Sequence, residues 1–229
     1  MQITRITILS ILLSIALFAF QSKYLPNVNI NVKCDKILHK RVFDICYSYK
    51  WKTPKVVVYS IDGNLIKQKH LSRKRLSFRP DYEIPSKYRS YSRDYSRTGF
   101  DRGHNIPNGV ANYNRTIQKQ TFLMSNIAPQ KPMLNRKLWA KIERFARFQA
   151  IKFKKVSVVT GVCGSEGHIR NGVNIPGYWY KIIYRPDGKV ISFMAPNTNV
   201  GMKRAKVRDY LVGVDEIRGR CVFKGEENK

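Results

Sequence analysis

The order in which strand-like and helix-like segments follow one another constrains the fold of this chain more than any other feature. Four segments are rich in β-branched and aromatic residues, which is typical of strands: residues 55–61, 156–161, 179–184 and 189–194. Apolar residues recur at helical spacing from Leu134 onward: Leu138, Ile142, Phe145 and Phe148. Strands and a long helix therefore mix without a βαβ rhythm, which predicts an α+β fold.

Turn and loop signals connect these segments. Residues 62–64 (DGN) predict a hairpin turn, after which the chain returns as a second strand from Leu65. Residues 72–98 are polar and basic, and they predict a long loop of the kind that often carries function. Further predictions complete the pattern: a strand or loop at 101–110, a short helix or strand at 116–124, a hairpin through 186–188 and a short helix at 207–214.

The charge of the chain narrows the set of partners. Its 229 residues include 43 Lys plus Arg and only 15 Asp plus Glu, a formal net charge of +28. Because such a charge repels itself in a folded protein, it favours a polyanionic partner, either nucleic acid or an anionic membrane surface. A generally basic proteome is the alternative explanation. A membrane-active toxin is disfavoured, because the sequence contains no amphipathic cationic helix.

The N-terminal segment predicts the compartment. Residues 6–20 are apolar and follow Arg5, which is the pattern of a secretory signal. This run is shorter than the roughly twenty residues that a spanning helix needs. Because no clean A-x-A cleavage pattern follows it, an uncleaved signal anchor stays open. The chain is therefore predicted to be a signal peptide or signal anchor at residues 1–22 and one exported domain at residues 23–229, periplasmic or secreted, with membrane anchoring through residues 6–20 as the alternative.

Cysteine usage agrees with export. Four cysteines follow the N-terminal segment, an even number that is typical of an oxidising compartment. Of the three pairings, Cys34–Cys46 with Cys163–Cys221 is favoured, because the first closes a short N-terminal loop and the second ties the C-terminus to the core. A structural zinc site is the competing interpretation, and the lack of a C-x-x-C spacing argues against it.

Residues 99–143 hold the groups that phosphodiester hydrolysis requires. The reaction needs a base for the attacking water, a sink for negative charge and help for the leaving oxygen. His104 is the plausible base among four histidines, because an imidazole pKa near 6.5 suits neutral pH. A Mg²⁺ ion, or Mn²⁺ in its place, supplies the charge sink, and Mg²⁺ takes oxygen ligands while keeping several waters. The sequence therefore predicts a metal-dependent nuclease.

Two polar residues on the predicted helix are candidates for the metal site. Asn135 and Glu143 are eight residues apart, so they lie about 12 Å apart along the axis and differ by about 80° around it. That separation is too large for both side chains to bind one ion directly. Asn135 is therefore predicted to bind the metal, and Glu143 to act through a water or orient a neighbour.

Several motifs resemble one family in order and spacing. GFDRGH at residues 99–104, FLMSNIAPQ at 122–130 and N-x₃-W-x₃-E at 135–143 resemble the DNA/RNA non-specific endonucleases, the ββα-metal or His-Me finger nucleases that include endonuclease G. Two flanking segments also match, R-x-x-F-R-x-D at 75–81 and T-G at 160–161. The resemblance covers about residues 50–195. It implies a central antiparallel sheet flanked by helices.

The resemblance also implies roles for individual residues. His104 matches the general base, Asn135 the direct ligand of a hydrated Mg²⁺, and Glu143 the acidic residue that positions metal-bound water. Asn126 matches the asparagine that supports the site. Arg75 matches the arginine that stabilises the phosphorane, with Arg79 or Arg102 as substitutes. Family members leave 5′-phosphate and 3′-hydroxyl ends, and they cut both DNA and RNA because they grip the backbone.

Two alternative functions remain beside this prediction. One is a membrane-anchored nuclease that processes DNA during uptake, which differs by whether the N-terminal segment is cleaved. The other is a cationic nucleic-acid-binding protein with a vestigial site, which predicts salt-dependent binding without metal-dependent cleavage. The biological role, the oligomeric state and the preference between DNA and RNA are left open.

Overall fold

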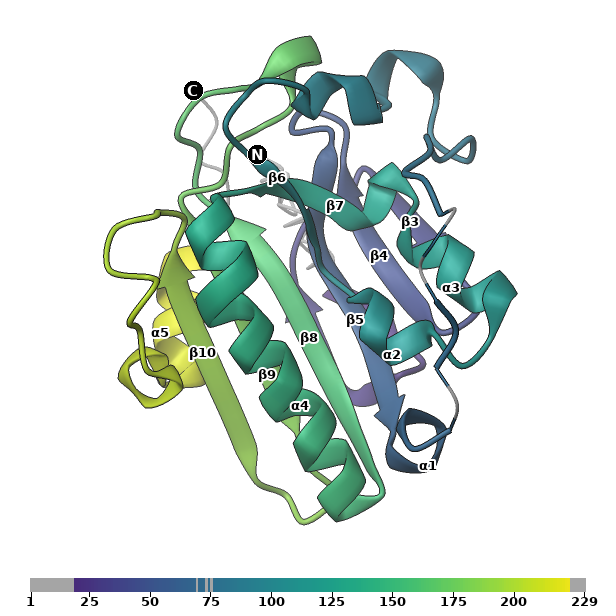
Figure 1. Cartoon of the computed structure of the whole chain (residues 1–229), viewed down its shortest axis with the longest axis vertical. Helices are drawn as coiled ribbons and strands as arrows, with labels where there is room; N and C mark the ends of the chain where they lie inside the picture. Colours follow the sequence, from purple (N-terminus) through teal and green to yellow (C-terminus); the bar gives the residue numbers. More distant parts are fainter. Residues whose placement is uncertain (1–18, 69, 73, 75, 223–229) are drawn as a thin grey trace, which may run out of the picture.

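A six-stranded antiparallel sheet forms the centre of the molecule (Figure 1). The structure is a computed structural model that describes residues 19–222, apart from residues 69, 73 and 75. Within that part of the chain, the strand order of this sheet is β10-β9-β8-β5-β4-β3, and every neighbouring pair is antiparallel. The strands are β3 (Lys36–His39), β4 (Phe43–Ser48), β5 (Thr53–Asp62), β8 (Lys155–Cys163), β9 (Tyr178–Tyr184) and β10 (Val190–Pro196). The predicted α+β fold with a flanked antiparallel sheet is confirmed.

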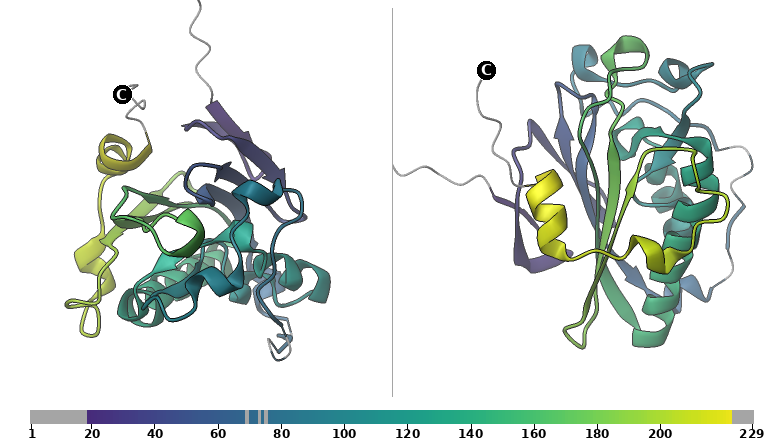
Figure 2. Two further views of the ribbon diagram at one scale, coloured as in Figure 1. Left: turned by 90° about the horizontal axis from the view of Figure 1, so that it is seen from above. Right: turned by 90° about the vertical axis from the view of Figure 1, so that its left-hand side faces the viewer.

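Both faces of this sheet are covered, which explains why its central strands are almost continuously apolar. In β5, Val57 and Tyr59 pack into the core on one face, while Val56 and Val58 pack into the core on the other. Figure 2 shows helices on one side of the sheet and a hairpin with a C-terminal helix on the other. These covering elements are α4 (Ala140–Phe153) on one side, and β1 (Ala19–Ser22), β2 (Leu25–Asn31) and α5 (Val214–Ile217) on the other.

A separate two-stranded sheet, in addition to the β1–β2 hairpin, lies beside the N-terminal end of the long helix. Strand β6 (Asp101–His104) pairs antiparallel with β7 (Ile127–Gln130), and both cross the upper half of the molecule in Figure 1. Two short helices, α2 (Asn108–Ala111) and α3 (Arg115–Thr121), follow β6 and lead the chain back to β7. The alternatives that the sequence left open at residues 101–110 and 116–124 thus resolve into a strand with a helical turn, and a helix.

The predicted long helix is present, with two departures from the expected pattern. Its first segment, Leu134–Trp139, is π-helical and continues directly into α4, and π-helical turns often occur at functional sites. Phe148, which recurs at helical spacing as predicted, is 57% exposed. The buried stripe instead follows four-residue steps to Ala146 and Ala150, and Phe148 falls outside it.

The predicted hairpin at residues 62–64 is wrong. Asp62 ends β5, and its carboxylate accepts the backbone N–H groups of Asn64 at 2.8 Å and Leu65 at 3.3 Å. These bonds cap the helical turn α1 (Gly63–Ile66), which is the preferred use of an aspartate at a helix start. A Cβ atom on Gly63 would lie 2.3 Å from the carbonyl oxygen of Ala150, so glycine permits this close approach to α4.

The predicted helix at residues 207–214 is also wrong. Only Val207–Tyr210 forms a short 3-10 turn. The chain then runs along the edge strand β10, where Leu211 bridges Phe193 and the N–H of Val212 donates to the carbonyl of Ser192 at 3.1 Å. Backbone pairing with the exposed edge of β10 replaces helix formation in this segment, and the next helix, α5, begins at Val214.

Other connections agree with their predictions. Strands β9 and β10 form the predicted hairpin, in which Val190 pairs with Tyr184. The basic segment at residues 72–98 has no regular element longer than the 3-10 turns Ser86–Tyr88 and Ser92–Tyr95 among its described residues.

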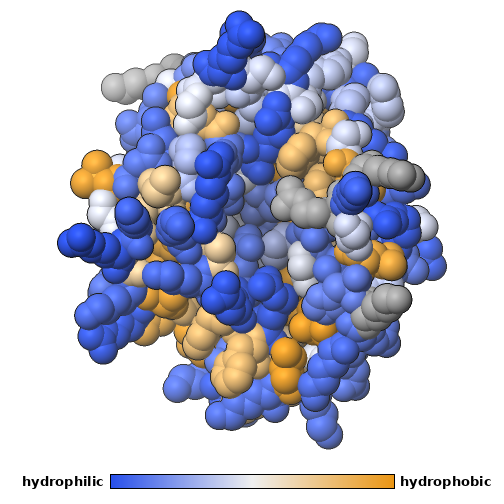
Figure 3. Space-filling view, viewed as in Figure 1, coloured by the Kyte–Doolittle hydropathy of each residue, from blue (hydrophilic) through white to orange (hydrophobic). Residues whose placement is uncertain are grey.

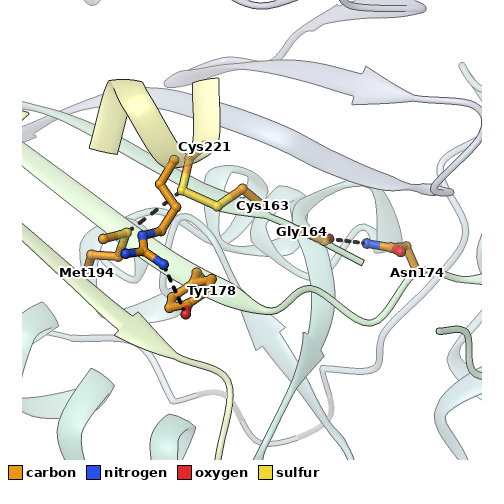
Figure 4. Close-up of a disulfide and its surroundings, with 7 residues drawn as sticks. Cys163, Gly164, Asn174, Tyr178, Met194 and Cys221 are labelled. Atoms are coloured by element: carbon orange, nitrogen blue, oxygen red, sulfur yellow. Dashed lines mark hydrogen bonds between the residues drawn. A yellow bond between two sulfur atoms is a disulfide. The ribbon is translucent and has the colours of Figure 1, made fainter. Parts of the chain in front are cut away.

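The predicted disulfide pairing is confirmed. Cys34 bonds to Cys46, and Cys163 bonds to Cys221. Figure 4 shows the second bond joining the end of β8 to the C-terminal helical segment. The zinc interpretation is wrong, because all four cysteine sulfurs are used in disulfides.

The signal peptide or anchor predicted at residues 1–22 falls mostly outside the described residues. The described part begins within it, at β1, where Phe20 is buried against the sheet. No helix among the described residues is long and apolar enough to span a membrane. The boundary between residues 22 and 23 stays a prediction.

Candidate active site

Strand β6 presents its side chains on two faces, as strand geometry requires. The guanidinium of Arg102 and the imidazole of His104 both lie against Phe78, with separations of 5.7 Å and 5.3 Å from its ring centre. The carboxylate of Asp101 belongs to the other face, where it meets the start of the long helix at Asn135. The DRGH motif therefore serves two adjoining halves of one site.

Close packing explains the glycine within this motif. A Cβ atom on Gly103 would lie 2.6 Å from Oε1 of Gln130 and 2.9 Å from Cη2 of Trp179. Both neighbours are fully buried, so neither can move away freely. The absent side chain thus lets β6 lie close to the core between Arg102 and His104.

Replacing Gly103 with alanine should therefore destabilise the protein by about 1–3 kcal/mol, the usual cost of overpacking. For a chain of this length, each kcal/mol corresponds to about 2–4 °C in Tm, which thermal unfolding measures. Gly213→Ala is the matched control, because a Cβ atom there meets nothing within 4 Å and its φ is −68°. Equal Tm values for the two variants would contradict the packing argument.

Aromatic rings position the imidazole of His104. The centres of Phe78 and Phe122 each lie 5.3 Å from that of the histidine ring, and Phe122 meets it edge to face. The backbone on either side is also fixed, since His104 pairs with Ile127 and the N–H of Asn105 donates to the carbonyl of Asn126 at 3.0 Å. The half-buried ring is thus held in one orientation.

Asn126 anchors the chain that follows His104. Its buried Nδ2 donates to the carbonyls of Ile106 at 3.0 Å and Thr121 at 2.9 Å, and its Oδ1 accepts the N–H of Ile106 at 3.0 Å. The amide is therefore occupied by backbone on both of its polar ends. Such an arrangement suits a supporting residue that acts through the position of His104.

Asp101 orients Asn135, and sequence reasoning assigned Asp101 no role. The Nδ2 of Asn135 donates to Oδ2 of Asp101 at 2.9 Å, so the amide oxygen of Asn135 points away from that carboxylate. Arg136 holds the same carboxylate with two further hydrogen bonds, at 2.6 Å and 2.8 Å. Asp101 lies inside the DRGH motif, three residues before His104. On a strand such residues point to opposite faces, and this was the available signal that Asp101 has different partners from His104.

The two halves of the site are close together. Asp101 and His104 are three residues apart on one strand, so their Cα atoms lie about 10 Å apart at the usual strand rise. Asn135 is in contact with the first of them. The strand thus carries His104 at one end and, at the other, the carboxylate that holds Asn135.

Glu143 lies two helical turns further along and faces a buried lysine. Burial raises the pKa of its carboxyl, and the positive charges of Lys181 and Arg147 oppose that rise. The Nζ of Lys181 is buried and donates to Oη of Tyr59 at 3.0 Å and to Oγ1 of Thr160. Burial also lowers the pKa of Lys181 to about 7, although the Glu143 carboxylate acts in the opposite direction.

Sequence reasoning missed Lys181, one lysine among many. The available signal was its place in β9, where the two-residue period puts it on the same face as Trp179 and Ile183, both fully buried. A lysine on a core-facing position needs polar partners, and here they are Tyr59 and Thr160.

The predicted arginines have different surroundings. Arg102 is fixed beside His104: its Nη2 donates to the carbonyl of Ser92 at 2.6 Å, and its guanidinium lies 5.7 Å from the ring centre of Tyr95. Arg79 is exposed, and its backbone pairs with the segment around Leu123. Arg75 lies outside the described residues, so its role stays a prediction.

The donor chemistry of the site fits a small hard cation. Asn135 offers an amide oxygen and Glu143 a carboxylate, and these are the ligand types that Mg²⁺ and Mn²⁺ prefer. No group of three His, Cys, Asp or Glu side chains that could hold a metal occurs in the described part of the chain.

Known proteins are similar to this chain in sequence and in fold. A family model described as DNA/RNA non-specific endonuclease matches residues 21–220. The mitochondrial nuclease of Saccharomyces cerevisiae is 29% identical over 204 residues, which cover 78% of this chain and 62% of that protein. Nuclease C1 of Cunninghamella echinulata var. echinulata is 35% identical over 174 residues, or 67% of this chain and 68% of that protein.

A solved structure of a complex between EndoG and EndoGI has the same fold, with a TM-score of 0.75 at 24% identity. The match covers 82% of this chain and 84% of that chain. The chain spans less than two thirds of the length of the yeast nuclease.

Proposed function

Because this chain belongs to the DNA/RNA non-specific endonuclease family, we propose that it is a metal-dependent endonuclease that hydrolyses the phosphodiester bonds of DNA and RNA. One observation carries the proposal: Asp101, at the start of the strand that ends in His104, accepts a hydrogen bond from Asn135 at the start of the long helix. This pairing supports a site in which an oriented amide oxygen and an imidazole act from the two ends of β6. A base can activate the attacking water, and a metal ion can stabilise the charge that develops on the phosphate.

In this proposal the imidazole of His104 accepts the proton of the attacking water. Its ring is held by Phe78 and Phe122, and Asn126 fixes the backbone that follows it. The guanidinium of Arg102, held on the same face of β6 by Ser92, stabilises the negative charge that develops on the phosphate. Arg75 is proposed to share this task.

Asn135 would hold the metal through its amide oxygen, and Glu143 would orient water beside it. When bound, Mg²⁺ or Mn²⁺ supplies charge stabilisation for the phosphate and the leaving oxygen. Asp101 keeps the amide of Asn135 in one orientation, and Lys181 and Arg147 favour the ionised form of Glu143. Ionised Glu143 can accept hydrogen bonds with both of its oxygens.

The charge of the chain supports a substrate gripped by its backbone. A net charge of +28 attracts any nucleic acid, and contacts to phosphates carry no sequence information. Figure 3 shows hydrophilic side chains over most of the face that carries β6 and α4. Sequence-independent action on both DNA and RNA follows from such a surface.

The products test this proposal most specifically. End-group analysis of cleaved DNA and RNA should find 5′-phosphate and 3′-hydroxyl ends on both substrates, because the activated water attacks phosphorus, the bond to the 3′ oxygen breaks, and the 2′-hydroxyl takes no part. Cleavage of RNA alone, leaving 2′,3′-cyclic phosphate ends, would contradict it.

Removing the charge of Lys181 should change how the cleavage activity varies with pH. Below about pH 7 this lysine carries its positive charge and opposes the rise in the pKa of Glu143. Lys181→Met removes that charge, so the pKa of Glu143 rises further and less of it is ionised at a given acidic pH. The acid limb of the profile of kcat/KM against pH should therefore move to higher pH.

Lys189→Met is the matched control for this measurement. Lys189 is exposed in the turn between β9 and β10, and its replacement changes the net charge by the same amount. Its acid limb should coincide with that of the unmodified protein. If the Lys181 and Lys189 variants gave the same profile, the electrostatic role of Lys181 would be excluded.

We also propose that the protein works in an exported, oxidising compartment. The two disulfides support this location, since such bonds persist outside the reducing cytosol. Sequencing the N-terminus of the exported protein tests the proposal. A new N-terminus near residue 23 would indicate a cleaved signal, and an intact residue 1 would indicate the signal anchor.

A further inference from the structure

The most exposed aromatic side chain among the described residues is Tyr82, at 76%. It lies in the basic segment that precedes β6, four residues after Phe78, whose ring contacts His104. Four residues span at most about 14 Å, so the Cα atom of Tyr82 is within that distance of the Cα atom of Phe78. A large aromatic ring that is exposed this close to the candidate active site is available to contact a bound substrate.

The backbone that carries Tyr82 is rigidly attached to the site. The preceding residue, Asp81, is buried, and its carboxylate accepts Oγ of Ser125 at 2.6 Å and pairs with Nζ of Lys40 at 2.7 Å. Ser125 directly precedes Asn126, the residue that anchors the chain after His104. The exposure of Tyr82 is therefore not a consequence of a loose loop.

A fixed cation backs the ring. The guanidinium of Arg89 lies 4.9 Å from the ring centre of Tyr82. Its Nε donates to the carbonyl of Ile84 at 2.6 Å, and its Nη2 donates to the carbonyl of Tyr82 itself at 3.4 Å. Because the guanidinium is anchored to backbone, the ring and the charge form a preformed pair whose binding costs little conformational entropy.

A second pair of this kind leads toward the catalytic strand. The guanidinium of Arg93 lies 4.8 Å from the ring centre of Tyr91. Between them lies Ser92, whose carbonyl accepts Nη2 of Arg102 at 2.6 Å. Figure 1 shows this stretch of chain at the upper end of the molecule, above β6 and β7. Aromatic and basic residues thus alternate along a path that ends next to His104.

We propose that Tyr82, backed by Arg89, is a stacking platform for an unpaired base of a single-stranded nucleic-acid substrate. The inference rests on the proposed nuclease function and adds a preference for single-stranded segments. Surfaces that bind single strands combine cations along the backbone with aromatic rings on which bases stack. In a duplex the bases are stacked on one another, so they cannot use the ring, whereas the cations serve both substrates.

Binding by the full chain carrying His104→Ala, measured in EDTA, tests the platform without cleavage. Tyr82→Ala should weaken binding of a single-stranded oligothymidine by about 5- to 140-fold, the range that corresponds to stacking of one base. Binding of a blunt duplex should not change. Tyr82→Trp, which keeps a stacking ring, should restore the single-strand affinity.

Two controls separate stacking from charge and from general surface effects. Phe148→Ala removes another exposed ring, on α4, and should leave both affinities unchanged. The slope of affinity against salt should be the same with and without Tyr82, because no phosphate contact is lost. An abasic single strand should bind the protein and the Tyr82→Ala variant equally.

Two results would overturn the platform: an unchanged single-strand affinity in Tyr82→Ala, or an equal loss for single strand and duplex. These outcomes are distinct from failure of the proposed function. A protein that binds but never cleaves would refute the nuclease proposal. The binding measurements on single strand and duplex would still decide whether Tyr82 is a stacking platform.

Discussion

Replacing His104 with alanine should reduce the cleavage of both DNA and RNA by about 10²–10⁴-fold, the range over which a positioned base contributes to a rate. The side chain is the one imidazole on β6, and its ring is held between Phe78 and Phe122 with Arg102 on the same face. Binding of nucleic acid should persist, because the positive charge of the surface does not depend on this residue. Initial rates with a fluorogenic oligonucleotide, together with Tm, measure both effects.

His168→Ala provides the matched control for this experiment. His168 is exposed and lies in the loop after β8, so its loss should leave the cleavage rate unchanged. A His104→Ala variant that folds and still cleaves at close to the unmodified rate would show that another group activates the water.

Replacing Asn135 with alanine should have the second largest effect. If its amide oxygen is the protein ligand of the metal, the Mg²⁺ concentration that gives half-maximal cleavage should rise by more than about 100-fold, since even residues that only orient a ligand cost about 10–100-fold. The fold should survive, because the side chain is half-buried and has one side-chain hydrogen bond in the described structure, to Asp101. A titration of rate against Mg²⁺ measures the change.

Asp101→Asn tests whether the orientation of that amide matters. The substitution removes the carboxylate that fixes both Asn135 and Arg136, so the Mg²⁺ requirement should rise by about 10–100-fold. Asn64→Ala is the control, because Asn64 is exposed on α1 and, among the described residues, has no hydrogen bond to Asp101 or Asn135. Equal Mg²⁺ titrations for the Asn135 and Asn64 variants would remove Asn135 from the metal site.

Much of the fold could be predicted from local patterns. The valines of β5 and β8 predicted strands, because strands buried on both faces are rich in β-branched residues. The apolar spacing after Leu134 predicted the long helix. The disulfide pairing could be chosen from chain positions alone. The strand and helix patterns depend on sequence-local chemistry, which a single sequence contains.

The errors arose where tertiary contacts decide the local structure. Asp62 and Gly63 have the composition of a hairpin turn, but the approach of Gly63 to Ala150 on α4 selects a capped helix instead. Leu211 and Val212 are compatible with a helix, but the free edge of β10 offers them backbone partners. Neither partner is visible in the local sequence.

The candidate site shows the same division. His104 and Asn135 were predicted from their residue types together with the order and spacing of the motifs around them. The orienting role of Asp101 and the buried position of Lys181 depend on which faces of β6 and β9 point inward, and strand register decides that.

The most direct test of the account is cleavage of supercoiled plasmid and of RNA by the full chain, in Mg²⁺ and in EDTA, with binding followed in the same samples. The account predicts that both substrates are cut in Mg²⁺, and that EDTA stops cleavage while binding persists. Tight, salt-dependent binding with no cleavage of either substrate in Mg²⁺ would contradict it, and would identify the chain as a nucleic-acid-binding protein with a vestigial site.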